Sequence, residues 1–225
     1  MKIRLFTTVL FTLGAVAAHG QEIRQEPLTV GDARYRLTGV DGSFTAHPDG
    51  TQPQGLTWDQ SLARCDALVA AIIARATPAG RKAPFVLERT VPQPQGQNWV
   101  EYSQRHQGYR ILGGGARIGL DAGGRITFAG VQYESEEFPT FKPRPLAILA
   151  WNARWAVPRW TTGPAMQAEL MIDPMGDAPA RLVYLVVYPV REWGHESGWQ
   201  VSVDAVTGKV VSSRTTTVNA AAAAR

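Results

Sequence analysis

The sequence contains one His-Glu pair, His195 followed by Glu196, which matches the first half of a zinc-binding motif. A zinc protease needs a second histidine four residues after the first, on the same face of a helix, with the glutamate as general base. Position 199 is Trp199 instead, and the pair lies in a glycine-containing stretch between two expected strands. His47 and His106 stand in expected turns with no second ligand near them in sequence. We therefore expect a polar hairpin loop at 195–196 and no metal site.

The other residue types that could perform catalysis are equally incomplete. No serine stands in a Gly-x-Ser-x-Gly elbow, and no expected helix follows the glycine runs at 113–115 and 123–124 to hold a phosphate. The carboxylates at 134–137 lack the spacing of a calcium loop. Cys65 is the single cysteine and falls on the apolar stripe of an expected helix, where it would be a small buried hydrophobe. We predict that the protein is not an enzyme and binds no cofactor.

Binding is the activity that the aromatic residues support. Five of the seven tryptophans fit core positions on expected helices or strands, namely Trp58, Trp99, Trp151, Trp155 and Trp199. Trp160 and Trp193 fall in expected loops, where a tryptophan can anchor an interface or fold back onto the edge of its own core. We predict a partner-binding patch of Trp193, His195 and Glu196, with Trp160 as a further candidate.

The first twenty residues have the features of a secretory signal. Lys2 and Arg4 precede an apolar stretch over 5–14 that is too short to span a bilayer, and 18–20 is an acceptable cleavage triplet. Cleavage before Ala18, an uncleaved anchor and a buried helix are the alternatives. No later stretch is long and apolar enough for a membrane span. We expect a secreted or periplasmic protein.

The net charge argues against a nucleic-acid partner. The whole chain has 23 basic and 19 acidic residues, but loss of Lys2 and Arg4 leaves 21 against 19. The remaining basic residues form no cluster or helical stripe, so the high isoelectric point does not indicate a nucleic-acid binder.

Periodicity and turn residues indicate the elements that would position these residues. An apolar stripe predicts a helix over 58–76, where Thr57 and Gln60 match a capping box. A second helix is expected over 146–157. The expected strands are 85–91, 99–105, 109–120, 125–131, 168–172, 181–190, 199–204 and 209–213. The strand at 181–190 is apolar enough to be buried on both faces.

The order helix, strands, helix, strands predicts an α+β fold of two small lobes, each a helix packed on an antiparallel sheet. The expected organisation is a signal peptide at 1–20, an irregular segment at 21–54, lobes at 55–142 and 143–214, and a flexible tail at 215–225.

Two stretches resemble a known family. The first resembles the fungalysin/thermolysin propeptide (FTP) motif through Gln104, Gln107-Gly108, Gly113-Gly114, Gly124-Arg125 and Gly130. The second resembles a PepSY module, whose tryptophan strand runs into a Val-Asp-Ala-x-Thr-Gly-x-Val turn, here Trp199 and 203–210. The two modules occur in tandem in the propeptides of thermolysin-like and fungalysin-like metalloproteases, and the resemblance covers 55–213.

The resemblance implies lobes of a cystatin-like kind and a specific partner. A propeptide of this family inhibits the metalloprotease catalytic domain and assists its folding as an intramolecular chaperone, and the segment corresponding to 215–225 enters the protease cleft. No protease domain follows within the 225 residues. A stand-alone inhibitor and a part of a longer precursor therefore both stay open. The alternative function is an extracellular or envelope adaptor of PepSY type with no protease partner.

Overall fold

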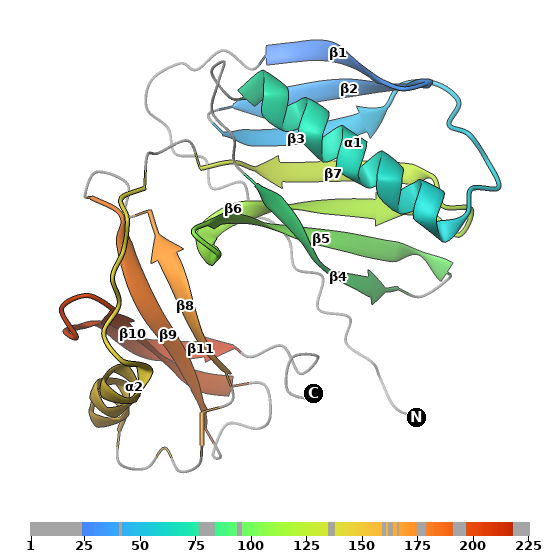
Figure 1. Cartoon of the computed structure of the whole chain (residues 1–225). Helices are drawn as coiled ribbons and strands as arrows, with labels where there is room; N and C mark the ends of the chain where they lie inside the picture. Colours follow the sequence, from blue (N-terminus) through green and yellow to red (C-terminus); the bar gives the residue numbers. More distant parts are fainter. Residues whose placement is uncertain are drawn as a thin grey trace, which may run out of the picture.

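The computed structural model describes residues 24–40, 42–76, 84–93, 96–134, 138–158, 161, 164–165, 167–174, 179–190 and 197–217. Figure 1 shows the arrangement of the elements. In chain order they are β1 (Arg24–Val30), β2 (Ala33–Val40), β3 (Ser43–Pro48), α1 (Trp58–Ala76), β4 (Phe85–Pro92), β5 (Asn98–His106), β6 (Tyr109–Leu120), β7 (Ile126–Gln132), α2 (Leu146–Trp155), β8 (Gln167–Asp173), β9 (Arg181–Pro189), β10 (Ser197–Asp204) and β11 (Val210–Thr217).

These strands form one 11-stranded sheet in the order β1-β2-β3-β7-β6-β8-β9-β10-β11, with β5 also pairing β6 and β4 pairing β5. Neighbouring strands are antiparallel except β6 and β8, which pair in parallel through Arg110 with Met171 and Ile111 with Ile172. The prediction of two cystatin-like lobes, each a helix on its own antiparallel sheet, is therefore wrong. Among the described residues the protein is mostly β, with two helices beside one mixed sheet. The joining pair is short and non-local, so no local sequence pattern could reveal it.

Residues 24–48 form three strands where the sequence analysis expected mostly irregular chain. Tyr35 and Leu37 of β2 point into the core, whereas Arg34 and Arg36 between them are exposed. A strand with one solvated face carries polar residues at every second position. Because of this alternation and the glycine-containing turns on either side, the segment has the amino-acid composition of a loop and was expected to be mostly irregular.

Helix α1 begins and ends as predicted, and its capping box is confirmed. The Gln60 side-chain oxygen accepts a hydrogen bond from the backbone N–H of Thr57 at 2.9 Å, and the Thr57 hydroxyl accepts one from the N–H of Gln60 at 3.3 Å. The buried face of α1 includes Cys65, Leu68 and Ile72, all 0% exposed, and packs on one face of the sheet. Burial raises the pKa of the Cys65 thiol to about 12, so this cysteine is the buried hydrophobe that the sequence predicted.

A second cluster of buried residues lies beside α2. Leu149 and Ala153 of this helix pack against β9 and β10. In β9 the consecutive residues Leu182, Val183 and Tyr184 are all buried, which confirms that this strand is covered on both faces. In the part of the chain that the structure describes, neither helix has the length and apolar character needed to cross a membrane.

The residues of the FTP-like stretch serve the fold. The Gln104 side chain is 2% exposed and bonds the backbone of Glu134 twice, donating to its C=O at 2.8 Å and accepting from its N–H at 2.9 Å. A Cβ on Gly114 would lie 2.5 Å from the Gln104 side-chain oxygen, so only glycine leaves room for this bridge. The positive φ of Gly108 (81°) closes the turn between β5 and β6.

The residues of the PepSY-like stretch form the turn between β10 and β11. One oxygen of Asp204 accepts hydrogen bonds from the backbone N–H groups of Val206 and Thr207, at 3.0 and 2.7 Å. Gly208 completes the turn with a φ of 77°. The motif therefore forms an Asx-type turn, and these contacts of its residues serve the backbone of that turn.

Candidate functional site

The predicted partner patch is not placed by the structure. Trp160, Trp193, His195 and Glu196 lie outside the described residues, as do the expected signal peptide at 1–20 and the tail beyond 217. Among the described residues no group of three or more His, Cys, Asp or Glu side chains is arranged to hold a metal ion. Two surfaces that the sequence analysis did not identify remain as candidate sites.

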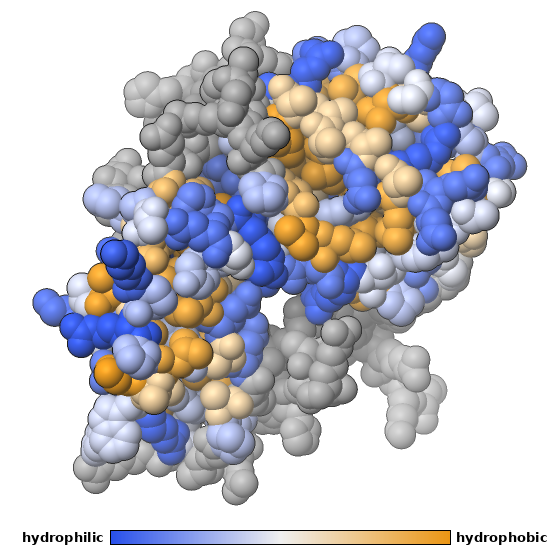
Figure 2. All heavy atoms as spheres, in the orientation of Figure 1, coloured by the Kyte–Doolittle hydropathy of each residue, from blue (hydrophilic) through white to orange (hydrophobic). Residues whose placement is uncertain are grey.

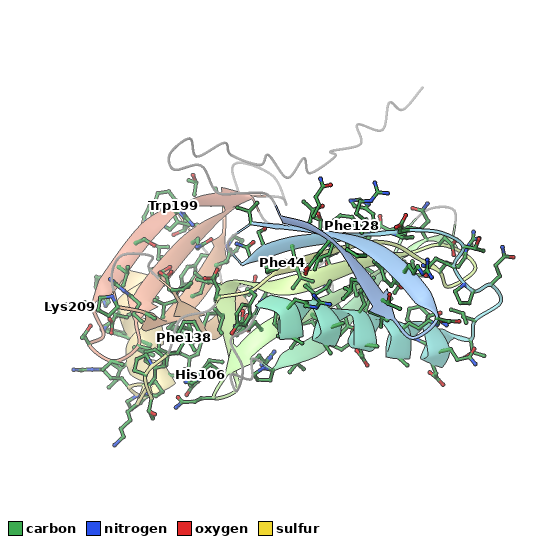
Figure 3. The ribbon with its side chains drawn as sticks, turned by 90° about the horizontal axis from the view of Figure 1, so that it is seen from above. Phe44, His106, Phe128, Phe138, Trp199 and Lys209 are labelled. Carbon is green, nitrogen blue, oxygen red and sulfur yellow. The ribbon has the colours of Figure 1, made fainter. Side chains whose placement is uncertain are left out.

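The first surface lies on the sheet face opposite α1. Val100, Ala46 and Ala129 point towards α1 and are fully buried. Their chain neighbours Trp99, His47 and Phe128 therefore point to the other face, because successive side chains of a strand alternate. We call these three side chains, from β5, β3 and β7, the aromatic row. Figure 3 shows Phe128 on the side of the sheet away from α1.

The aromatic row is a continuous set of ring contacts. The ring centroids of His47 and Phe128 are 5.3 Å apart, and those of Trp99 and Phe128 are 6.4 Å apart in an edge-to-face arrangement. Gly119 of β6 lies between Trp99 and Phe128 in the register of the sheet. A Cβ at Gly119 would lie 3.1 Å from the Trp99 ring, so the aromatic rings lie directly over the backbone here.

Charged side chains border the aromatic row on β4, β5 and β6. The Glu101 carboxylate accepts hydrogen bonds from Arg89 Nε at 2.6 Å and from Arg117 Nε at 3.0 Å. Burial by itself raises the pKa of Glu101, but these two bonds outweigh burial and hold the pKa below its usual value. The Arg117 guanidinium also lies 5.3 Å from the centroid of the Trp99 ring. The result is a fixed arginine beside an aromatic side chain that is only half-buried.

The second surface is the outward side of α2. The prediction that Trp151 and Trp155 are core residues is wrong, because they are 64% and 71% exposed. Ile148 of the same helix is also exposed. We call these three side chains the α2 surface. Where Figure 1 places α2, Figure 2 shows hydrophobic residues interspersed with strongly hydrophilic ones.

The other tryptophans divide between core and surface. Trp199 packs against the second cluster, as predicted. Trp58 is 43% exposed and Trp99 lies on the outer face of the sheet, so the prediction that both are core residues is wrong. The sequence placed these tryptophans on the correct helices and strands, but it did not show whether each one lies on the buried or the exposed face. Residue size could have indicated which side of α2 is buried. Leu149 and Ala153, four residues apart, are smaller than Trp151 and Trp155 and so allow the helix to approach the sheet closely.

Basic side chains lie on α2 and on the segments next to it. Lys142 and Arg144 precede the helix, Arg154 lies in its last turn, and Lys209 follows the β10–β11 turn. That turn contacts α2 through a hydrogen bond of 2.8 Å from Asn152 to the C=O of Gly208. All four cations are exposed. The segment 138–158 contains no aspartate or glutamate, and the β10–β11 turn contains one, Asp204, which bonds the backbone N–H groups of that turn.

Comparison with known proteins yields a weak structural likeness. No protein-family model and no curated protein matches the chain. Among solved structures it is similar to the Bacillus megaterium YpeB C-terminal domain, with a TM-score of 0.43 and 10% sequence identity over 87% of this chain and 89% of that one. A likeness of this degree assigns no activity and no partner. The function of the protein must therefore be argued from its own surfaces.

Proposed function

We propose that this is an exported, non-enzymatic binding protein whose aromatic row contacts the catalytic domain of a metalloprotease, which the protein inhibits or helps to fold. The observation that carries the proposal is that two of the three members of the aromatic row, Trp99 and Phe128, lie on strands within 55–142, the segment that contains the FTP-like stretch. The residues of that stretch that build the fold point inward or form turns, and the residues left over, Trp99, Arg117 and Phe128, point outward on one face.

The composition of this face suits a protein interface. Tryptophan and arginine are the residue types that contribute most binding energy at protein contacts, and charged residues gather around such anchors. Four neighbouring strands, β5, β6, β7 and β3, carry the row and its arginine, and they span about 15 Å across their hydrogen-bonding direction. The Glu101 bridge fixes Arg117 before binding, which lowers the entropy lost on association.

The test is inhibition and refolding of thermolysin-like enzymes by the purified mature protein. We expect slower peptide hydrolysis, or a higher yield of active enzyme after dilution from denaturant. His47→Ala combined with Phe128→Ala should weaken either effect at least about tenfold, as expected for loss of interface anchors. Trp58→Ala is the matched control, because it removes an exposed aromatic side chain from α1.

The outcome also separates the two functional hypotheses. No inhibition and no refolding assistance across several such enzymes would reject the protease proposal. The second candidate, an extracellular or envelope adaptor, is favoured by the α2 surface, which the protease proposal does not use. Capture of a defined envelope component by the immobilised protein, with no protease bound, would support that candidate.

A further inference from the structure

The α2 surface lies in a different region of the molecule from the aromatic row, on the helix that covers β9 and β10 (Figure 1). We propose that this surface docks the protein onto an anionic lipid bilayer, with α2 lying in the plane of the interface. The proposal does not rest on the contact with a protease.

The apolar side chains of the α2 surface form a stripe on the helix. At 3.6 residues per turn, Ile148, Trp151 and Trp155 fall within an arc of about 60°. Leu149 and Ala153, which bind the helix to the sheet, lie on the other side and are fully buried. The stripe is therefore directed away from the protein's own core, and no described element covers it.

The two tryptophans are suited to a membrane interface. Their ring centroids are 5.7 Å apart at an angle of 70°, so they form a paired aromatic projection that is still largely exposed to water. Indole rings favour the boundary between acyl chains and headgroups, because the ring is apolar and its N–H needs a polar partner. A short helix with such a face binds in the plane of the interface without spanning the bilayer.

The charges around α2 select an anionic surface. Lys142, Arg144, Arg154 and Lys209 lie on α2 or on the segments beside it. The turn that carries Lys209 also contains Asp204, whose carboxylate accepts hydrogen bonds from the backbone of that turn. Arg144 donates to the C=O of Val206 at 2.9 Å and Arg154 to that of Thr161 at 3.2 Å, so both guanidinium groups are held beside α2. Figure 3 shows Lys209 at the end of the molecule that carries α2. Each such cation strengthens binding to an anionic leaflet by about fivefold.

The same charges argue against a second copy of this chain as the occupant, because two such surfaces would bring like charges together. A protein with an acidic rim would match the charges, but it would also need a groove shaped to a convex helix with two projecting indoles. A lipid interface deforms around such a projection, which is why we favour it.

The experiment is flotation of the full mature protein with vesicles of phosphatidylcholine and phosphatidylglycerol, and with vesicles of phosphatidylcholine alone. We expect binding to the anionic vesicles, a blue shift of tryptophan emission, and weakening by salt. Trp151→Ala with Trp155→Ala should lower the partition coefficient at least about tenfold. Lys142→Glu with Lys209→Glu should lower it at least about twenty-five-fold, because two cations are lost. Trp58→Ala should bind as the unmodified protein does, and circular dichroism checks that each variant is folded.

Three results would overturn the proposal. The first is absence of binding to anionic vesicles at low salt, and the second is equal binding by the double tryptophan variant. The third is self-association in sedimentation equilibrium that the same variant abolishes, which would make the α2 surface a contact between copies. The first result, combined with loss of protease inhibition by the double tryptophan variant, would replace the membrane by a protein as the occupant of the α2 surface. Because vesicle binding needs no protease, failure here leaves the proposed function untouched, and the converse also holds.

Discussion

At the scale of the single residue, the side chains that made the sequence resemble a propeptide family turn out to hold the backbone in place. Gln104 and Asp204 each use a side chain to bond backbone groups that the sheet ladder cannot reach. Gly114 leaves the space that Gln104 requires. A motif of this kind identifies a fold, because backbone groups buried in any such fold need the same partners.

Gln104 is the residue whose loss should affect stability most directly. Gln104→Leu keeps the volume but removes two hydrogen bonds to a backbone segment at a nearly inaccessible site. We expect the free energy of unfolding to fall by about 2–4 kcal/mol. Urea denaturation measures this change. Gln132→Leu, at an exposed position of β7, should change stability by less than about 0.5 kcal/mol, and an equal effect of both substitutions would contradict the assigned role.

Glu101 should make stability depend on pH. Its pKa lies below the ordinary value of 4.5 in the folded protein. The stabilisation is therefore present above the unfolded pKa and disappears as the pH falls through the folded one. Because both arginine partners are more than two-fifths exposed, we expect Glu101→Gln to cost at most about 1 kcal/mol at neutral pH. The difference from the unmodified protein should vanish in urea titrations below about pH 3, whereas Asp49→Asn, in an exposed pair, should show little difference at any pH.

At the scale of the element, α2 shows how a short helix can present apolar residues on every side. Leu146, Ile148, Leu149, Trp151 and Trp155 leave no clean polar face in its ten residues. The structure resolves the ambiguity by close packing: the smaller pair faces β9 and β10, and the indoles remain outside. An exposed apolar stripe on a folded protein indicates a binding surface.

The two sides of α2 should therefore respond differently to truncation. Trp151→Ala with Trp155→Ala should change the free energy of unfolding by less than about 1 kcal/mol, because both rings are already in water and lose mainly their mutual contact. Leu149→Ala should cost about 2–5 kcal/mol through the cavity it leaves. Thermal unfolding of both variants distinguishes the sides, and a reversed order would mean that the indoles are the packed face.

At the scale of the whole molecule, the sheet joins two clusters of buried residues that lie beside different helices. The parallel pair of β6 and β8 makes the connection. Tyr109 and Ile111 of β6 pack in the second cluster, whereas Ala116, Ile118 and Leu120 of the same strand belong to the first. The fold is therefore one mixed sheet, although its elements follow in the order of two similar halves.

Cys65 reports on the integrity of the first cluster. The thiol is 0% exposed and burial raises its pKa to about 12, so it should react with a thiol reagent only when α1 separates from the sheet. We expect the labelling rate in native buffer to be at least about a thousandfold below that in denaturant. Stopped labelling followed by mass spectrometry measures both rates. Rapid labelling of folded protein would show that α1 opens independently of the sheet.

Most of the elements were predictable because their signals are local. The limits of α1 and β6, the capping box at Thr57 and the burial of β9 follow from residues within a few positions of one another. The candidate surfaces were not predictable in this way. The aromatic row assembles His47, Trp99 and Phe128 from three strands, and their neighbourhood depends on pairings among strands that are distant in sequence.

The sequence by itself thus determined which segments form the two helices and most of the strands, that Cys65 is buried, and which known motifs the turns resemble. Only the tertiary structure decided that residues 24–48 join the sheet, that β6 and β8 pair in parallel, and that Trp151 and Trp155 face outward. The physical reason is that periodicity records which residues of an element share a face. Which of those faces is buried depends on the shape and packing of partners elsewhere in the chain.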